Sequence, residues 1–304
     1  MKLFEKICKM TQEELKVWLN NRYINKGFET IYEDGFLHLI PQENAIPICF
    51  TAHMDTVHKE KVKKILVEKH KDKTILSSPQ GIGGDDRCGI YMIVRLLDMG
   101  YKPYVVFCED EEVGCVGASK FCKTKYINNM NIKFMVELDR RNGNDAVYYD
   151  LDNKEFEEFV TETTGYVTAI GSMSDISYLA PEAGVAAVNL SCGYYKEHTL
   201  EHYVVWEEME RTLEATIYLI AAARVESTPK FEYKEIERFG WSYNKYGWYD
   251  DYDDYYTEYV TITWIEDSKL NSETYDGKSV EECIGKFIID HPYLRYDDIV
   301  VEEC

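Results

Sequence analysis

The sequence predicts an α/β fold in which a mixed, mostly parallel β-sheet lies between two layers of helices. One observation is that short apolar runs, with the length of buried strands, alternate with segments of helical spacing. A second is that several of these runs end in acidic residues or histidine. In layered α/β folds, ligands bind beyond the carboxyl ends of the strands, where such side chains meet. Both observations lead to the same three-layer architecture.

The individual elements follow from local patterns, beginning at the N-terminus. Residues 2–26 have the spacing of one or two amphipathic helices. Residues 28–40 alternate around Glu33-Asp34-Gly35, which predicts a hairpin, and residues 65–77 predict another. Four apolar runs predict buried strands: 45–55, 104–112, 132–139 and 184–192. Four segments predict helices: 88–99, 118–124, 153–164 and 206–224.

Composition divides the chain into two parts. A length of 304 residues allows one domain with a full core and an appendage. Residues 226–304 carry 20 acidic and 8 basic side chains, and residues 230–304 hold 11 of the 25 tyrosines. We therefore expect a first domain over residues 1–228 and a small, acidic, aromatic-rich folded module over residues 229–304. Within this module the pattern predicts a strand at 260–265 and a helix at 279–290.

Charge and hydropathy limit the partners and the location of the protein. The formal net charge is −21, which argues against nucleic acid or an anionic membrane as a partner, because both require basic surfaces. The chain has no apolar run of about 18 residues that could span a bilayer. The N-terminal segment has charges throughout and lacks the apolar core of a signal peptide, so we expect a cytoplasmic protein. Nine scattered cysteines fit reduced core thiols.

Five residues of metal-ligand type occur in separate local contexts along the chain: His53, Asp85, Glu112, Asp139 and His198. Most of them lie at or just after the end of a predicted strand, so they are expected to meet at one edge of the sheet. Three carboxylates and two imidazoles can hold two divalent ions, with one carboxylate shared between them. The pattern therefore favours a two-metal hydrolase. A structural calcium protein is disfavoured, because calcium prefers oxygen ligands to histidine.

Two of these contexts have both a functional and a structural interpretation. On a strand, residues i and i+2 share a face, so Asp55 is placed to accept the second ring N–H of His53 and fix its tautomer. The Asp85-Asp86 pair follows a glycine-rich segment. In the functional interpretation Asp85 bridges two cations and Asp86 caps the next helix. In the structural one the pair is only a cap, and Arg87 lies on the surface.

The remaining ligands have similar alternatives. Glu111 and Glu112 are either solvated charge at a strand end, or a ligand with an unligated neighbour that takes a proton from water. Asp139 ends an apolar run, where an acid is costly to bury unless it is paired or ligated. His198 and His202 are four residues apart and could share a helix face. His198 directly follows the strand and loop, so it is preferred as the ligand, with His202 packing behind it.

The chain resembles the zinc exopeptidases with co-catalytic metal sites, a superfamily of aminopeptidases, peptidase T-like tripeptidases, carboxypeptidases and acyl-amino-acid hydrolases. The segments HMDTV, GGDDRCG, DEEVGCVGA, LD and EHT resemble its successive ligand blocks over residues 45–225. The resemblance implies that His53 and Asp139 bind one metal, that Glu112 and His198 bind the other, and that Asp85 bridges them. Asp55 would orient His53, Glu111 would be the general base, and the Asp85–Asp86 peptide bond would be cis.

The resemblance also implies a function. It indicates two Zn²⁺ ions, with Co²⁺ or Mn²⁺ as possible substitutes, and a metal-activated water that cleaves short peptides. An aminopeptidase or a di- or tripeptidase is the leading interpretation. An N-acyl-amino-acid deacylase and a non-catalytic binding scaffold are the alternatives. Tyr194 or Tyr195 could stabilise the oxyanion, and Ser174-Asp175 could shape the pocket or cap a helix.

One departure from several relatives concerns an inserted lid. Those relatives carry a lid or dimerisation domain between the fourth and fifth ligands. Only 58 residues separate Asp139 from His198 in this chain. This length is too short for a lid together with the strands that the fold requires there. The sequence therefore predicts a catalytic domain without an inserted lid.

Overall fold

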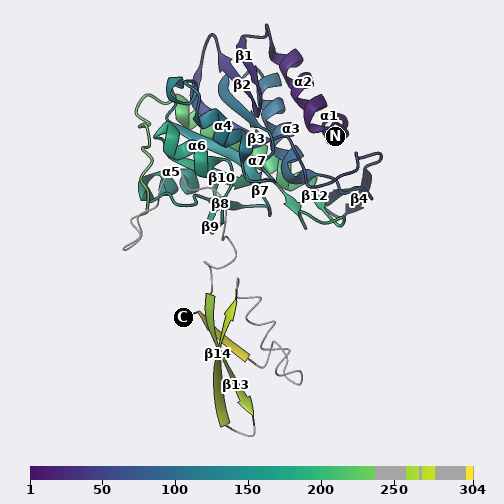
Figure 1. The fold of residues 1–304 in the computed structure, drawn as a ribbon, viewed down its shortest axis with the longest axis vertical. Coiled ribbons are helices and arrows are strands. Elements are labelled where there is room, and N and C mark those ends of the chain that lie inside the picture. Colours follow the sequence, from purple (N-terminus) through teal and green to yellow (C-terminus); the bar gives the residue numbers. More distant parts are fainter. Residues whose placement is uncertain (237–257, 267–268, 278–298, 304) are drawn as a thin grey trace. The chain divides into compact units, whose positions relative to one another are not determined.

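A computed structural model describes residues 1–236, 258–266, 269–277 and 299–303 (Figure 1). The chain forms two compact units, Met1–Glu237 and Arg238–Cys304. The first unit extends past residue 228, because the following segment hydrogen-bonds to its sheet. The backbone N–H of Phe231 donates to the carbonyl of Lys133 at 2.9 Å, and its carbonyl accepts from the N–H of Ala186 at 2.8 Å.

The first unit is built on an eight-stranded sheet with the order β1-β2-β6-β3-β7-β10-β8-β9. The four central strands β6, β3, β7 and β10 are parallel to one another, whereas β2 and β8 join them in antiparallel pairs. The sheet is therefore mixed with a parallel centre, as predicted. Its strands are β1 Phe28–Glu33, β2 Phe36–Pro41, β3 Ile46–His53, β6 Pro103–Cys108, β7 Phe134–Arg140, β8 Asp145–Val147, β9 Val167–Ala169 and β10 Ala187–Ser191.

Helices cover both faces of this sheet and complete three layers (Figure 1). Alternate residues of the central strands enter different cores. On β6, Val105 and Phe107 pack in the larger core with α3 and α7, whereas Val106 and Cys108 pack in the smaller core with α4 and α6. The helices are α1 Lys2–Cys8, α2 Gln12–Tyr23, α3 Gly84–Asp98, α4 Val116–Cys122, α5 Lys154–Thr164, α6 Ile176–Ala183 and α7 Trp206–Arg224, with a 3₁₀ turn η1 at Ile127–Asn129.

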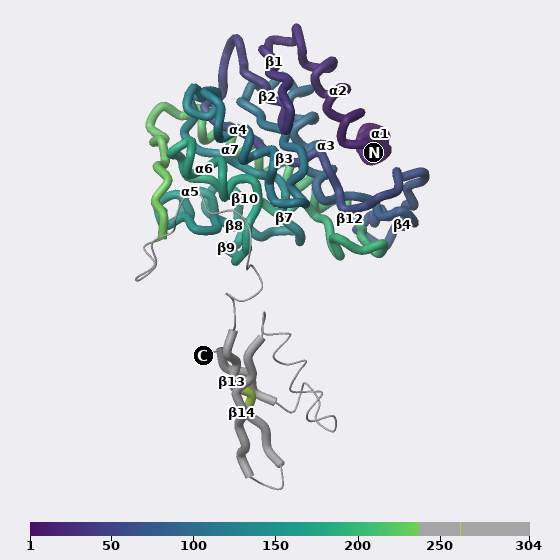
Figure 2. The backbone as a smooth tube through the Cα atoms, in the orientation of Figure 1, coloured from purple at the N-terminus to yellow at the C-terminus, as the bar shows by residue number. Residues whose placement is uncertain are grey.

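The N-terminal helices extend the larger core. Helix α1 lies against α3 (Figure 2), and Phe4 packs edge-on against Tyr91 and Trp206. Helix α2 begins with a capping box, because the Thr11 side chain accepts from the N–H of Glu14, whose carboxylate accepts from the N–H of Thr11. Both helices therefore brace the layer that carries α3.

A second, antiparallel sheet has the order β11-β12-β5-β4. It contains the predicted hairpin at 65–77 and joins it to the segment on either side of His198. Its strands are β4 Leu66–His70, β5 Lys73–Ser77, β11 Tyr194–Tyr195 and β12 Tyr203–Val205. The small sheet thus positions the loop that carries the fifth predicted ligand.

No separate lid interrupts the chain between Asp139 and His198. All the residues between them are described, and they form β8, α5, β9, α6, β10 and β11. These elements belong to the two sheets and the helical layers, so the predicted absence of an inserted lid is confirmed.

The second unit is described through three strands. β13 Glu258–Glu266 pairs antiparallel with β14 Lys269–Gly277 and with β15 Ile299–Glu303. The strand predicted at 260–265 is present within β13. The helix predicted at 279–290 lies outside the described residues. Among the helices that the structure does describe, none has the length and apolar character needed to cross a membrane.

Candidate metal centre

The five predicted ligands converge at the carboxyl-terminal edge of the parallel strands. His53 is the last residue of β3, and Asp139 lies near the end of β7. Glu112 lies in the turn after β6, and Asp85 lies at the start of α3. His198 comes from the loop between β11 and β12. Five segments that are distant in sequence therefore supply one cluster, as the strand-end argument predicts.

Asp85 connects the two histidines of the cluster. Its Oδ1 lies 2.9 Å from Nε2 of His53, and its Oδ2 lies 3.3 Å from Nε2 of His198. The two histidines have different second partners. Asp139 Oδ1 lies 3.4 Å from His53 Nε2, and Glu112 Oε2 lies 3.0 Å from His198 Nε2. The cluster thus has two halves that share one carboxylate.

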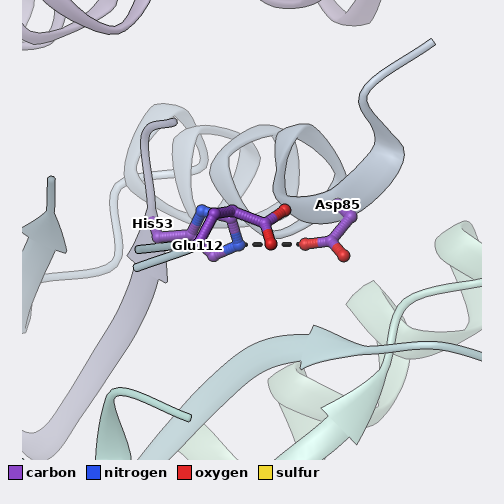
Figure 3. A group of neighbouring side chains, drawn as sticks. All are labelled: His53, Asp85 and Glu112. Atoms are coloured by element: carbon purple, nitrogen blue, oxygen red, sulfur yellow. Dashed lines mark hydrogen bonds and ion pairs between the residues drawn. The ribbon is translucent and has the colours of Figure 1, made fainter. Parts of the chain in front are cut away.

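The donor set and its spacing fit divalent cations. Ligand atoms of His53, Asp85 and Glu112 lie within 4.8 Å of one another (Figure 3). Zinc–ligand bonds of about 2.0–2.1 Å place neighbouring ligand atoms of a tetrahedral site about 3.3 Å apart, similar to the contacts above. Oε1 of Glu112 is buried and has no hydrogen-bond partner. A buried carboxylate oxygen without a partner is costly, and a cation would satisfy it.

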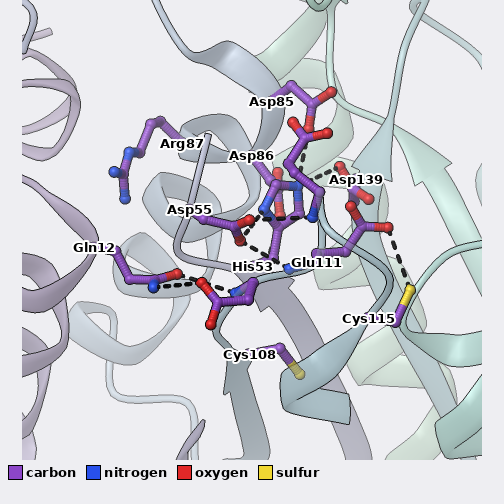
Figure 4. A network of polar contacts seen from close by, with 12 residues as sticks. Gln12, His53, Asp55, Asp85, Asp86, Arg87, Cys108, Glu111, Cys115 and Asp139 are labelled. Atoms are coloured by element: carbon purple, nitrogen blue, oxygen red, sulfur yellow. Dashed lines mark hydrogen bonds and ion pairs between the residues drawn. The ribbon is translucent and has the colours of Figure 1, made fainter. Parts of the chain in front are cut away.

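Asp55 contacts residues of both halves of the cluster through atoms that do not face the predicted cation positions. Its Oδ1 lies 3.0 Å from Nδ1 of His53, which leaves Nε2 of that ring facing Asp85 and Asp139. The same carboxylate accepts the backbone N–H groups of Glu111 and Glu112, both at 3.1 Å. Asp55 therefore fixes the orientation of one predicted ligand and the backbone of another (Figure 4).

Asp86 is a buried cap rather than a ligand. Its Oδ1 accepts the N–H of Gly89 at 2.9 Å, and its Oδ2 accepts the N–H of His53 at 3.2 Å. The Asp85–Asp86 peptide bond is cis, as the resemblance implies. The structural alternative, with Arg87 on the surface, is wrong for Arg87, because that side chain is buried.

Glu111 lies beside the predicted ligands in the turn between β6 and α4. Strand β6 ends at Cys108, before the predicted end at 112, so both glutamates belong to a loop. This loop is tightly closed: the N–H groups of Gly114 and Cys115 both donate to the Glu111 carbonyl, at 2.8 and 2.9 Å. The Cys115 thiol donates to Glu111 Oε1 at 3.6 Å. The carboxylate is thus held near the cluster without a strong partner.

Crowded acidic groups perturb the protonation of the cluster. Burial, followed by the negative charges of Asp139 and Asp175, raises the pKa of Glu111 to about 9, although His53 opposes the shift. Burial, followed by the charge of Asp85, raises the pKa of Glu112 to about 7. Burial also raises the pKa of Asp139 to about 6. The arrangement therefore lacks the positive charge that would keep all these groups ionised.

Two buried acids beside the cluster bear on its chemistry. Glu137 was not singled out from the sequence, although it shares a strand face with Asp139 at i+2. Asp175 makes no side-chain cap bond to α6, and neither of its buried carboxylate oxygens has a hydrogen-bond partner. Its neighbour Ser174 donates to Asp139 Oδ2 at 3.0 Å. Ser174 therefore supports a predicted ligand, and Asp175 occupies the N-cap position of α6 without a side-chain cap bond.

The tyrosines and the second histidine take structural positions. The Tyr194 hydroxyl donates to the backbone carbonyl of Asp139 at 3.0 Å, and the Tyr195 hydroxyl donates to Glu208 at 2.5 Å. His198 and His202 do not share a helix, because residues 196–202 form turns and the φ of His198 is +60°. His202 is buried with its ring 5.5 Å from that of Tyr194, which fits its predicted packing role.

Comparisons with known proteins give the same fold. A similar structure is that of the aminopeptidase PepT from Bacillus cereus ATCC 10987, at 15% identity and a TM-score of 0.57, covering 74% of this chain and 97% of that chain. Another is a tripeptidase from Staphylococcus aureus, at 12% identity and a TM-score of 0.57, covering 73% and 97%. A third is an aminopeptidase from the archaeon Desulfurococcus kamchatkensis, at 13% identity and a TM-score of 0.54, covering 72% and 93%.

At the level of sequence, no protein-family model and no curated protein matches. Identities of this size establish the architecture and leave activity to the site itself. The chain therefore has the predicted three-layer α/β fold, the same fold as these solved aminopeptidase and tripeptidase structures.

Proposed function

We propose that this protein is a metal-dependent exopeptidase of the zinc exopeptidase superfamily, most specifically an aminopeptidase or a di- or tripeptidase. The observation that carries the proposal is the position of Asp85. Each of its two oxygens contacts a different histidine, and each histidine contacts a different second acid. This is the arrangement expected of two cation sites that share one carboxylate. The likeness to solved peptidases supports the choice of reaction.

The residues divide naturally between two ions. His53 and Asp139 would hold one ion, Glu112 and His198 would hold the other, and Asp85 would contact both. Mixed imidazole and carboxylate donors suit Zn²⁺, and also accept Co²⁺ or Mn²⁺. When bound, such ions supply the positive charge that lowers the pKa of water and polarises a carbonyl group.

Glu111 is the proposed general base. It lies next to Glu112 in the chain and forms no hydrogen bond or ion pair with either histidine among the described residues. Bound cations would lower its raised pKa, so that the carboxylate could accept a proton. In peptide hydrolysis it would accept a proton from the attacking water and return it to the leaving amine. Asp55 holds the Glu111 backbone N–H and would keep this carboxylate in register with the ligands. Tyr194 already donates to Asp139, so an oxyanion role for it is not proposed.

The loops around the cluster favour peptides with apolar side chains. Val113 follows the two glutamates and is 73% exposed, and Leu200 follows His198 and is 68% exposed. Ile170, whose carbonyl accepts from Arg140 next to Asp139, is 93% exposed. These three exposed apolar side chains lie on loops close in sequence to predicted ligands or to their partners, so we propose them as contacts for apolar substrate side chains. We therefore expect substrates with leucine or phenylalanine beside the scissile bond.

The decisive experiment combines metal analysis with a Glu111→Gln variant. Purified protein is loaded with Zn²⁺, Co²⁺ or Mn²⁺ and assayed on leucyl and phenylalanyl di- and tripeptides, aminoacyl anilides and N-acyl amino acids. We expect about two ions per chain and cleavage of the peptides. Replacing Glu111 by glutamine keeps the shape but removes the base, so kcat should fall by at least about 100-fold while two ions remain bound.

A matched control is Glu226→Gln, which makes the same change at an exposed position and should keep full activity. If Glu111→Gln retains wild-type kcat, the proposed general base is wrong. If the protein binds no stoichiometric metal, the metal centre is wrong. Cleavage confined to N-acyl amino acids would replace the exopeptidase with a deacylase.

A further inference from the structure

Arg87 lines a cavity of about 170 Å³ beside the candidate metal centre. The cavity lies between the α1–α2 junction, the segment after His53 and the glycine-rich segment Gly81–Gly83. A cavity of about 150 Å³ can hold a molecule the size of benzene, so this one is large enough for a small polyatomic ion. The cavity therefore has room for a ligand, and its chemistry depends on the side chains that line it.

The Arg87 guanidinium is buried with most of its hydrogen-bond donors unused. The residue is 3% exposed. Its Nη2 donates to the carbonyl of Met10 at 3.1 Å, and its buried Nη1 has no hydrogen-bond partner. Within the described part of the chain, no carboxylate lies within salt-bridge distance of it. Asp55 and Asp86 attract the guanidinium without forming an ion pair with it, so a buried donor is left without an acceptor, which is costly.

Other side chains around the cavity also favour an anion. Lys59 and Lys61 line it together with Arg87, against the acids Asp55 and Glu60, and Lys61 is also paired with Glu14 at 2.6 Å. Both oxygens of Asp55 are already engaged, by the His53 ring and by two backbone N–H groups. The lining thus has one formal cation more than it has acids, in a chain whose net charge is −21.

We propose that this cavity, here called the Arg87 pocket, is an oxyanion site that binds a carboxylate or phosphate group. The planar guanidinium offers paired N–H donors that match two oxygens of either group. Figure 4 shows the Arg87 side chain extending away from Asp85 and Asp139, with Asp55 between them. The pocket is therefore separate from the proposed metal ligands, and its occupation does not depend on the proposed peptidase activity.

The test measures phosphate binding to the full-length chain by calorimetry after metal ions have been removed. Removing the ions prevents phosphate from binding at the ligand cluster. We expect wild type to bind one phosphate and to gain thermal stability as phosphate is added. Arg87→Met should weaken phosphate binding by about tenfold or more, because it removes the charged donors. Lys59→Glu, at an exposed position on the rim, should weaken it by a smaller factor.

Two comparisons separate a binding role from a structural one. Lys123→Glu makes the same charge change as Lys59→Glu at an exposed position outside the pocket and should leave phosphate binding unchanged. Because Arg87→Met could fail to fold, its melting temperature is recorded without phosphate, and Lys59→Glu gives an independent reading in a folded chain. A structural role alone would lower the melting temperature of Arg87→Met without a phosphate-dependent difference from wild type.

The source of the anion is distinguished by peptide substrates. If the pocket takes the terminal carboxylate of a peptide, KM should be lower for tripeptides than for their C-terminal amides, and Lys59→Glu should reduce this difference. If it takes a free anion, Lys59→Glu should change the KM for tripeptides and the KM for their amides by the same factor. Phosphate should then bind together with the peptide. Either result supports an oxyanion site. Failure of wild type to bind phosphate, together with no carboxylate preference, would overturn the proposal and leave a pocket that holds water only.

Discussion

Asp55 positions more groups of the site than any single predicted ligand does. One carboxylate orients the His53 ring and accepts the N–H groups of Glu111 and Glu112. It therefore connects the end of β3 with the loop after β6, and with them the two halves of the cluster. A carboxylate can accept all three hydrogen bonds, whereas an amide offers a single oxygen and two donors.

We predict that Asp55→Asn weakens both metal binding and catalysis. The amide group must direct donors towards groups that are themselves donors, so the His53 ring and the 111–112 loop lose their common support. Changes to groups that support metal ligands typically cost 10–100-fold. We therefore expect zinc affinity and kcat/KM each to fall by about 10–100-fold, as measured by competition with a chelating dye and by peptide assay.

Asp98→Asn is the matched control, since it makes the same change in the exposed pair with Arg22 at the far end of α3. Its metal affinity and activity should match wild type. Wild-type zinc affinity in Asp55→Asn would show that Asp55 does not position the ligands.

At the scale of single residues, the sequence located the cluster but missed its buried surroundings. His53, Asp85, Glu112, Asp139 and His198 were predictable because each follows or precedes a strongly apolar run, which fixes its place at the sheet edge. The burial of Arg87 and the empty acceptors of Asp175 were not predictable. Both depend on how α1, α4 and α6 pack on other elements, and no local pattern records that packing.

At the scale of elements, helix α3 approaches β7 more closely than any side chain would allow. A Cβ atom on Gly89 would lie 2.1 Å from the carbonyl oxygen of Leu138 and 2.6 Å from each carboxylate oxygen of Asp86. Real Cβ atoms do not approach other atoms this closely. Gly89 therefore permits the contact that places Asp85, at the start of the helix, beside Asp139, at the end of the strand.

We predict that Gly89→Ala destabilises the protein even though alanine favours helix. Alanine is about 1 kcal/mol better than glycine inside a helix, but the added methyl group must displace the β7 backbone or the Asp86 cap. We expect a net loss of about 1–3 kcal/mol in the free energy of unfolding by urea denaturation, together with weaker metal binding.

The control is Asn21→Ala on the exposed face of α2, where alanine should gain its helix propensity and leave stability unchanged or slightly higher. An increase in stability for Gly89→Ala, equal to that of Asn21→Ala, would mean that α3 can move away from β7 at no cost.

The order and type of the elements were largely predictable, because apolar periodicity dominates a buried parallel sheet. The helix predicted at 206–224 agrees with α7, and both hairpins are present. The differences occur at polar segments. Strand β6 ends at Cys108 because the following acids turn back towards the sheet edge, and residues 196–202 form turns rather than a helix. In both places the backbone conformation is set by tertiary contacts at the cluster rather than by local propensity.

At the scale of the whole molecule, acidic groups are concentrated at one edge of the sheet of the first unit. In the absence of ions, the raised pKa values of Glu112 and Asp139 mean that the folded chain keeps protons that the unfolded chain releases. A carboxyl group whose pKa is raised on folding stabilises the fold at low pH and loses that contribution as the pH rises. His198, whose pKa is raised to about 9 chiefly by its hydrogen bond to Asp85, shifts stability in the same direction.

We predict that the metal-free chain becomes less stable as the pH rises from about 4.5 to 7, and that Zn²⁺ reverses the loss. The window begins at the ordinary pKa of a glutamate and ends at the pKa of about 7 of Glu112 in the fold. We expect the melting temperature to fall by about 5 °C across it, corresponding to about 2 kcal/mol. Stoichiometric zinc at pH 7 should restore at least that much.

Glu112→Gln provides the comparison for this window, since it removes one of the raised carboxyl groups. Its melting temperature should depend less steeply on pH, and zinc should raise the melting temperature at pH 7 by less than it does in wild type. A wild-type melting temperature that rises steadily between pH 4.5 and 7 without metal would contradict the predicted crowding of acids.

The contacts within the cluster also constrain when the site can be assembled during synthesis. His53 touches Asp139, and Glu112 touches His198, so the two contacts interleave along the chain. Asp85 must meet partners that are translated both before and after it. If the cluster binds two cations as proposed, its second position is incomplete until residue 198 has left the ribosome. Binding of both ions would then follow translation of about two-thirds of the chain, and the ions would connect segments synthesised early with segments synthesised late.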